Sequence, residues 1–354
     1  MTERYLNFAS FGPPTQPVLA AAHRVDERAA AGVPAAELHR EDERAIAAVS
    51  RVTGFAADGI ALMPNTSTGL LHTAFAVPSG RVLVSRAEFP ANLYPWWRAA
   101  EAGRLEVEVV EPAAPERPMS PDDVAGALTA DTVAVAVSAV SFQTGYRVDL
   151  GALREVIGDR LLVVDAIQAM GVVQQDWRTA DVIAVGGQKW LRAGWGTGFL
   201  ALSPRALSRL EPLLTGWVGV ENAGVYSGDE HRRRADARGF TVTNGAPSAA
   251  AALTAALEGI EDEGVAEVAL RVSARASRLT ERLASHGVSV VSPASAAERA
   301  GIVVARFSDA PRLHAELALA GVQTTLIGDD RIRFSPHTTT PFEVLDEVAA
   351  LLGR

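Results

Sequence analysis

The stretch GGQKWL, residues 186–191, contains Lys189, the single lysine of the chain. The sequence has 33 lysine and arginine residues, of which one is lysine, so the other 32 are arginine. A general preference for arginine explains why lysine is scarce, but it does not explain why one lysine remains beside two glycines. A primary amine can form an imine with an aldehyde, whereas a guanidinium stays protonated and is a poor nucleophile. Lys189 is therefore the first candidate for covalent chemistry.

Two further sets of polar groups follow apolar runs that are typical of buried strands. Asp165 ends the run RLLVVD, and the hydroxyl cluster Thr66, Ser67 and Thr68 follows the run GIALM. Because ligands of open α/β sheets bind at the carboxyl ends of strands, we expect these groups to meet Lys189 at one edge. Taken singly, an acid after a strand is more often a turn residue, and hydroxyls before a helix are more often an N-cap.

Together, these groups match the chemical needs of one cofactor, pyridoxal 5'-phosphate. The amine would react with its aldehyde, and the carboxylate would keep its pyridine nitrogen protonated. Hydroxyls and free amides at the start of a helix would hold its phosphate. The sequence therefore predicts a pyridoxal phosphate site, and it indicates no metal site.

The elements that must position these residues follow an alternating pattern of short apolar runs and longer amphipathic stretches. Apolar runs that alternate with helical stretches are typical of a mainly parallel sheet in an α/β domain. Strands are predicted at 59–63, 81–85, 105–110, 132–138, 160–165, 181–186 and 198–203. We therefore expect a large α/β domain with a mainly parallel seven-stranded sheet flanked by helices.

The pattern changes after about residue 245, where a long alanine-rich helical region begins. Short strands are then predicted at 288–291, 302–307 and 332–335, with helices between and after the last two. This indicates a smaller C-terminal α+β domain. We expect the large domain over residues 16–250 and the small domain over 251–354, with residues 1–15 as a separate N-terminal segment.

Composition excludes several classes of function. The formal net charge of −9 argues against a nucleic-acid surface, which usually requires a basic excess. The chain has no cysteine, so disulfides, thiolate metal sites and persulfide chemistry on the chain's own sulfur are excluded. Its start has no apolar core segment of a secretory signal, and no apolar run is long enough to span a bilayer. We expect a cytoplasmic protein that binds neither nucleic acid nor membrane.

Four segments resemble the class V aminotransferase family of fold-type I pyridoxal phosphate enzymes. This family includes cysteine desulfurases, kynureninases, isopenicillin N epimerase and hercynylcysteine sulfoxide lyase. VVDAIQAMGVVQQDW, followed by ADVIAVGGQKWLRAGWGTGFLAL, is similar to the family's cofactor signature. SRAEFPANLYPWW resembles the segment that carries the residue stacked on the pyridine ring, and IRFSPHTTT resembles the segment that binds the substrate carboxylate. YLNFASFGPP resembles the N-terminal strand that reaches into the site.

The resemblance implies a role for each matching residue. Lys189 would be the Schiff-base lysine and Asp165 the partner of the pyridinium nitrogen. Gln168 would hydrogen-bond the phenolic oxygen of the cofactor, and Phe89 would stack on its ring. Arg333 would clamp the substrate carboxylate, a task that suits a planar bidentate fork. Thr66, Ser67, Thr68 and Gln188 are the candidates for binding phosphate. Phe8 and Ser10 are candidates for binding substrate because they adjoin the N-terminal motif.

The chain departs from the family's pattern at two positions around the lysine. Many members have histidine where this chain has Gln188, and serine or threonine where it has Gly186. The phosphate must then depend more on the cluster at residues 66–68, on the loop before it, or on a partner subunit. The family often supplies a phosphate contact from the second subunit of a homodimer with a shared active site. The matching region here is FTVTNGAPS, in which Thr243 and Asn244 are the candidates.

The residues implied so far serve more than one reaction at Cα of an amino acid or amine substrate. After an external aldimine forms, the freed lysine would remove the Cα proton, and β-elimination, transamination or epimerisation could follow. Members with desulfurase activity usually have a histidine above the ring and need a cysteine, and this chain has Phe89 and no cysteine. We expect a β-eliminating lyase of the carbon–sulfur type. An aminotransferase is the close alternative, and an epimerase or a non-catalytic module that binds the cofactor stays open.

Overall fold

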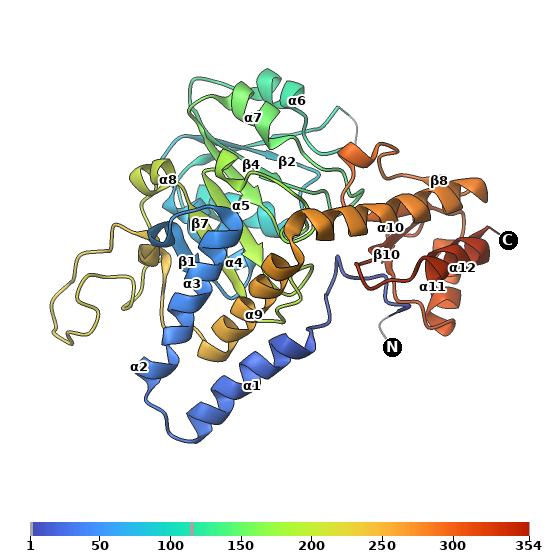
Figure 1. Cartoon of the computed structure of the whole chain (residues 1–354). Helices are drawn as coiled ribbons and strands as arrows, with labels where there is room; N and C mark the ends of the chain where they lie inside the picture. Colours follow the sequence, from blue (N-terminus) through green and yellow to red (C-terminus); the bar gives the residue numbers. More distant parts are fainter. Residues whose placement is uncertain (1–2, 114–116, 354) are drawn as a thin grey trace.

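The computed structural model describes residues 3–113 and 117–353, which form two sheets with their own helices (Figure 1). The strands of the larger sheet are β1 (Ile60–Leu62), β2 (Arg81–Ser85), β3 (Glu106–Val110), β4 (Thr132–Ser138), β5 (Leu161–Asp165), β6 (Val182–Gly186) and β7 (Gly198–Leu202). All seven coincide with the predicted runs to within a residue at each end. No helix within the described ranges has the length and apolar character needed to cross a membrane.

The larger sheet has the strand order β1-β7-β6-β5-β4-β2-β3. Strands β2 to β6 pair in parallel, while β7 runs antiparallel to both β6 and β1. Since β1 is thereby parallel to β5 and β6, the carboxyl ends of these three strands lie at the same edge of the sheet. This arrangement confirms the predicted mainly parallel seven-stranded sheet and brings the candidate residues to one edge.

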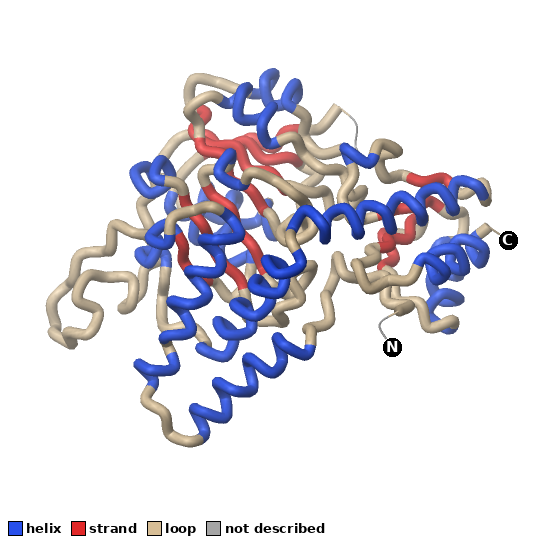
Figure 2. The backbone as a smooth tube through the Cα atoms, viewed as in Figure 1, coloured by secondary structure: helices blue, strands red, loops and turns tan. Residues whose placement is uncertain are grey.

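Helices cover both faces of this sheet (Figures 1 and 2). One face packs against α1 (Gln16–Ala30), α3 (Arg40–Thr53), α7 (Leu150–Ile157) and α9 (Pro247–Glu263), and the other packs against α4 (Thr66–Ala76) and α5 (Tyr94–Glu101). The shorter helices α2 (Ala35–Leu38), α6 (Pro121–Ala127) and α8 (Pro204–Arg209) complete the domain. Central strands that are apolar on both faces, such as the TVAVAVS of β4, are buried in this layered arrangement.

Side-chain caps determine where helices α4, α6 and α7 begin. The Asn65 side chain accepts a hydrogen bond from the amide of Thr68, 2.9 Å away, and thereby starts α4. Ser120 and Asp123 form a capping box at α6, and Asp149 caps α7 through the amide of Ala152. A side-chain oxygen that satisfies a free helix amide stabilises the helix by about 1 kcal/mol. The cap at Asn65 therefore sets the position of the hydroxyls at the start of α4.

The second sheet is antiparallel, with the order β10-β11-β9-β8. Its strands are β8 (Ser289–Val290), β9 (Val303–Arg306), β10 (Thr325–Ile327) and β11 (Arg331–Phe334), and its helices are α10 (Val265–Ser285), α11 (Ala310–Leu319) and α12 (Phe342–Leu352). This confirms the smaller α+β domain, with β10 as an additional strand that the sequence pattern did not predict. In Figure 1, α10 runs from the large domain to this small one.

The boundary expected between residues 250 and 251 falls inside α9. Leu253, Ala256 and Leu257 of α9 pack in the core of the large sheet, whereas Leu279 and Leu283 of α10 pack in the core of the small sheet. The large-domain core therefore extends beyond residue 250. Gly264, with a φ of 84°, separates the two helices and allows the chain to turn there.

The N-terminal segment joins the two domains. Leu6 and Phe8 form backbone hydrogen bonds with Gln323 and Ser335 of the small domain. The amide of Gly12 donates to the carbonyl of Gln188 in the large domain, at 2.8 Å. A Cβ at Gly12 would lie only 2.0 Å from the carbonyl oxygen of Lys189, so this close approach requires glycine. The segment thus passes directly against the backbone of the candidate lysine.

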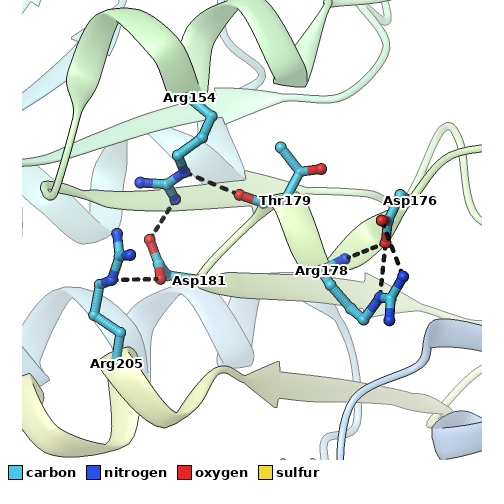
Figure 3. Close-up of a pocket in the computed structure, with 6 residues that line it drawn as sticks. All are labelled: Arg154, Asp176, Arg178, Thr179, Asp181 and Arg205. Carbon is cyan, nitrogen blue, oxygen red and sulfur yellow. Dashed lines mark hydrogen bonds and ion pairs between the residues drawn. The ribbon is translucent and has the colours of Figure 1, made fainter.

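A charged hollow lies at the opposite edge of the large sheet (Figure 3). Asp181 directly precedes β6, and Arg154 and Arg205 converge on its carboxylate, while Arg178 pairs with Asp176 nearby. These ion pairs attach α7 and α8 to the sheet. The length of β6 separates this hollow from Lys189. We therefore assign its charged residues a structural role.

Candidate active site

Lys189 lies in the turn that follows β6 and is half-buried, and the N-terminal segment passes against its backbone. Burial lowers the pKa of its amine to about 8, the carboxylate of Asp165 raises it, and the positive charge of Arg333 lowers it. A lysine with this pKa is partly unprotonated near neutral pH and can act as a nucleophile or base. Its nitrogen lies 5.6 Å from the centre of the Phe89 ring.

Asp165 ends β5 and is buried. Burial raises the pKa of its carboxyl group to about 6, although the amide of Ile167, which donates at 3.0 Å, and the charge of Lys189 both lower it. Asp165 forms no salt bridge within the described residues, so its charge has no fixed counterion there. A buried carboxylate of this kind is suited to a protonated heterocyclic nitrogen.

The polar side chains of Gln188 and Thr66 lie over Gly186, at the end of β6. A Cβ at this position would lie 2.4 Å from Oε1 of Gln188 and 3.1 Å from Oγ1 of Thr66. The Thr66 hydroxyl is buried and has no hydrogen-bond partner. Buried hydroxyls are normally satisfied, so an unpaired one at a helix start indicates a place for an anionic oxygen. The side chains of Thr66 and Gln188 therefore converge where the sequence predicts the cofactor phosphate.

Two other candidates of the hydroxyl cluster differ from Thr66. The Thr68 hydroxyl contacts the Asn65 side chain at 3.1 Å, so it contributes to the helix cap. The Ser67 side chain is exposed at the start of α4. The amides of the first helical turn have no partner within the helix, so Thr66 and Ser67 offer backbone donors as well as hydroxyls.

Gln168 is fixed by contacts on both sides of its amide. Its nitrogen donates to the carbonyl of Ala9 at 2.9 Å, and its oxygen accepts from the indole of Trp190 at 2.8 Å. One amide hydrogen remains for a ligand oxygen. Gln168 therefore connects the N-terminal segment to the cofactor region as well as offering a donor there.

Arg333 of β11 is buried, and burial lowers the pKa of its guanidinium to about 10. It donates to the hydroxyl of Ser10 at 2.6 Å and to the carbonyl of Phe142 at 3.2 Å. Its Nε has no hydrogen-bond partner, and no carboxylate within the described ranges pairs with it. A buried cation with a free donor is suited to a carboxylate brought by a ligand.

Phe8 is fully enclosed, in contrast to the expectation that it contacts substrate. Its ring stacks on His337, with ring centres 4.7 Å apart, and it has no exposed surface. Phe8 therefore packs the junction between the domains and has no surface for a bound molecule. Ser10, by contrast, lies beside Arg333, where the sequence predicts substrate.

Thr243 and Asn244 are not brought to Lys189 within one chain. Both are exposed, and they line a cavity of about 640 Å³ beside α4 together with Thr68. The indole of Trp217 donates to the Thr243 hydroxyl at 3.2 Å. The surrounding loop projects from the large domain (Figures 1 and 2). Neither residue touches the group formed by Lys189, Asp165 and Arg333.

Sequence reasoning missed several residues that lie around Lys189, Asp165 and Arg333. Phe142 packs edge-on against Phe89, with ring centres 5.1 Å apart, and Thr325 lies 3.3 Å from Arg333. Glu88, a buried acid directly before Phe89, was also missed. A signal was present for Glu88, because an acid just after an apolar strand is the same pattern that identified Asp165.

The chain matches the family model described as Aminotransferase class-V over residues 31–322. A kynureninase from Deinococcus radiodurans is 30% identical, over 79% of this chain and 70% of that protein. A kynureninase from Eremothecium gossypii is 28% identical, over 86% of this chain and 77% of that protein. Among solved structures, a cystine C–S lyase in complex with its reaction product cysteine persulfide has a TM-score of 0.90 and 20% identity, covering 99% of this chain and 97% of that one. At this identity, the last match concerns the fold alone.

Proposed function

The chain belongs to the class-V aminotransferase family and is a pyridoxal phosphate-dependent enzyme, and from that premise we propose that it is a lyase acting on an α-amino acid. In this proposal it removes a substituent joined to Cβ through sulfur. The observation that carries the proposal is the position of Phe89 over Lys189, in a chain without cysteine.

The residues present fit the cofactor. The unpaired Thr66 hydroxyl and the nearby side-chain amide of Gln188 suit its phosphate, and Asp165 suits its ring nitrogen. When bound, pyridoxal phosphate supplies an electron sink for negative charge at Cα of the substrate. Lys189 would hold the cofactor covalently and then act as the base at Cα, for which its lowered pKa is suitable.

Arg333 would orient the substrate through its α-carboxylate. Its free Nε donor and lack of an acidic partner favour this role over a structural ion pair. The guanidinium is already held by Ser10 and Phe142, so little conformational entropy would be lost when the carboxylate binds. Arg333 is near enough to Lys189 for its charge to lower the pKa of that amine, so a carboxylate bound to Arg333 would bring Cα into the neighbourhood of Lys189.

The aromatic pair above Lys189 favours sulfur as the leaving atom. Phe89 and Phe142 offer apolar ring surface, and neither transfers protons. A thiolate leaves without a general acid more readily than an alkoxide, because a thiol has a pKa of about 8.5, and sulfur makes favourable contacts with aromatic rings. Without cysteine, the chain has no thiol that could keep the sulfur, so the product would be released.

We further propose a homodimer that completes the phosphate site. Trp217 and Tyr226 are large apolar side chains exposed on the projecting loop that leads to Thr243 and Asn244. Exposed apolar residues gathered on one segment are typical of an interface. A second copy of the chain that covers this loop would bring Thr243 or Asn244 toward the partner's Thr66.

The test is to incubate the cofactor-loaded enzyme with L-cystine, L-cysteine, S-alkyl cysteines and L-kynurenine, without any keto acid. The proposal predicts pyruvate and ammonia in equal amounts from at least one sulfur-containing substrate, and none with the Lys189→Ala variant. Amino-group transfer that requires an added keto acid would identify an aminotransferase instead. Loss of optical activity without pyruvate would identify an epimerase, and turnover of kynurenine alone would replace the carbon–sulfur assignment.

A further inference from the structure

Glu88 is a buried acid that the chemistry described above does not use. It lies in the loop after β2 and directly precedes Phe89, and only 7% of its surface is exposed. No arginine, lysine or histidine within the described residues forms an ion pair with it. A buried carboxyl group without a cation is costly unless hydrogen bonds replace its water. The contacts of Glu88 therefore indicate why it is present.

The carboxyl group of Glu88 is held by two residues. One oxygen accepts from the amide of Ser138 at 2.8 Å, and the other contacts the Ser138 hydroxyl and accepts from the side chain of Asn92 at 3.1 Å. Ser138 is the last residue of β4 and pairs in register with Asp165 of β5. Glu88 thus attaches the loop after β2 to the sheet edge, one strand away from the cofactor carboxylate.

The same contacts connect to a rigid part of the core. Asn92 accepts from the indole of Trp96 at 3.1 Å, and both residues are completely buried. On the other side, Gln143 donates to the carbonyl of Ala87 at 3.2 Å. The backbone on both sides of Phe89 is therefore fixed by hydrogen bonds, with the carboxyl group of Glu88 at their centre.

Phe89 itself has few contacts that could hold it in place. Phe89 is 43% exposed, and among the described residues the ring that packs against it is that of Phe142. A half-exposed ring with one aromatic neighbour gains too little from that contact to fix the position of a loop. Its place over Lys189 must therefore be determined by the backbone that carries it.

We propose that Glu88 is a positioning residue of this active site, which sets the place of Phe89 over Lys189 by binding Ser138 and Asn92. This inference depends on the proposed role of Phe89 as the cover of the cofactor ring. It assigns no proton transfer to Glu88, whose carboxyl group is enclosed by its own partners.

The titration of Glu88 supports a role that does not require its charge. Burial raises the pKa of its carboxyl group to about 7, against the effect of the Ser138 and Asn92 hydrogen bonds, and the nearby charge of Asp165 raises it further. Near neutral pH the group is therefore partly protonated. A protonated acid can donate to the Ser138 hydroxyl and still accept from the Ser138 amide. Glutamine has the same shape and can make both Ser138 contacts, but its amide nitrogen cannot accept the hydrogen bond from Asn92.

The experiment compares Glu88→Ala, Glu88→Gln, Phe89→Ala and the double variant Glu88→Ala/Phe89→Ala. Each apo-protein is titrated with pyridoxal phosphate to obtain its Kd, and the visible circular dichroism of the bound cofactor is recorded. We expect Glu88→Ala and Phe89→Ala each to weaken binding about tenfold and to reduce the dichroic signal. We expect Glu88→Gln to lie between the wild-type protein and Glu88→Ala in both measurements, because it keeps the contacts to Ser138 and loses the one to Asn92.

The double variant decides whether Glu88 acts through Phe89. If it does, Glu88→Ala adds almost nothing in the Phe89→Ala background. Effects that multiply would overturn the proposal, as would a Glu88→Gln variant as impaired as Glu88→Ala, which would indicate a role for the charge. If Glu88→Ala does not fold, Glu88→Asp is used in its place. The aspartate side chain keeps the carboxyl group but is one methylene shorter. A wild-type protein without a cofactor band would contradict the proposed function, which is a separate outcome.

Discussion

Arg333 donates a 2.6 Å hydrogen bond to the hydroxyl of Ser10, although the two residues belong to opposite ends of the chain. Ser10 follows Ala9, whose carbonyl accepts from Gln168 in the large domain. The N-terminal segment therefore contacts both Arg333 of the small domain, proposed to bind substrate, and Gln168 of the large domain, proposed to contact the cofactor. This contact explains how a site divided between two domains keeps its geometry.

Replacing Arg333 by glutamine should raise KM for the amino acid by about 100-fold, since charge-assisted hydrogen bonds to a carboxylate contribute about 1.5–3 kcal/mol. The kcat should change much less, because Lys189 and Asp165 remain in place. Steady-state kinetics with the best substrate of the panel would measure both. Ser10→Ala is the matched control, with a smaller rise in KM expected because Phe142 still holds the guanidinium. Equal effects on KM and kcat would argue against a role confined to binding.

Gly186 should be required because Gln188 fills the space above it. A methyl group added by Gly186→Ala would lie 2.4 Å from Oε1 of Gln188. We expect this variant to bind pyridoxal phosphate about tenfold more weakly, with a smaller effect on pyridoxal, which has no phosphate. Fluorescence titration with both compounds would measure the difference.

The second variant, Gly186→Ala/Gln188→Ala, supplies the control for this prediction. Removing the glutamine side chain frees the space, so the double variant should bind no worse than Gln188→Ala alone. Additive losses would mean that the glycine is needed for a different reason.

The sequence predicted the elements of the large sheet well, because their signal is local. Runs such as the LLVVD of β5 and the VIAVG of β6 are apolar on both faces, and only buried parallel strands combine that pattern with intervening helices. Strand β10 was missed because its residues, Thr325 to Ile327, are half-buried at the edge of the small sheet. The position of α9 was uncertain from sequence because an alanine-rich helix can pack on either domain.

The candidate site was predictable where a residue type has few alternatives. The single lysine after a strand, Lys189, and the acid that ends the neighbouring strand, Asp165, could be named as site candidates from the sequence alone. The packing of Phe8 into the core and the cap made by Thr68 depend on three-dimensional neighbours, so no local pattern reveals them. Glu88 had the same local signal as Asp165, an acid just after an apolar strand, but its contact with Ser138 of β4 becomes visible only in the fold.

Asp165 should lower the stability of the apo-protein at neutral pH. Burial raises the pKa of its carboxyl group from 3.8 to about 6. Between these two values the folded chain holds a proton that the unfolded chain has released, so stability falls as the pH rises through this range. Above pH 6 the full cost is present, on the order of 3 kcal/mol.

The Asp165→Asn variant cannot ionise at this position, so its apo form should unfold at a higher temperature than the wild-type protein at pH 8. At pH 4 the difference should vanish, because the wild-type carboxyl group is then neutral as well. Thermal unfolding of both apo-proteins at the two pH values measures this directly. A lower unfolding temperature for the variant at pH 8 would show that the carboxylate stabilises the fold.

The proposed shared site predicts complementation between two inactive variants. Lys189→Ala lacks the reactive amine, and Thr243→Ala/Asn244→Ala lacks the contact proposed to come from the second subunit. When equal amounts are unfolded and refolded together, random pairing gives one intact site in each mixed dimer, about a quarter of wild-type activity. Activity no greater than the mean of the two parents would place these residues in the site of their own chain, or outside any site.

The central claim, that Lys189 holds the cofactor, has a direct test in a chain with one lysine. Purified wild-type protein is loaded with pyridoxal phosphate, its visible spectrum is recorded, and borohydride reduction is followed by peptide mapping, with Lys189→Arg in parallel. The account predicts a yellow absorption band that reduction abolishes, a label fixed on Lys189, and neither in the variant, which keeps the charge but cannot form the imine. If the wild-type protein gives no band, or if the label is found on the N-terminal amine alone, the assignment of the site is contradicted.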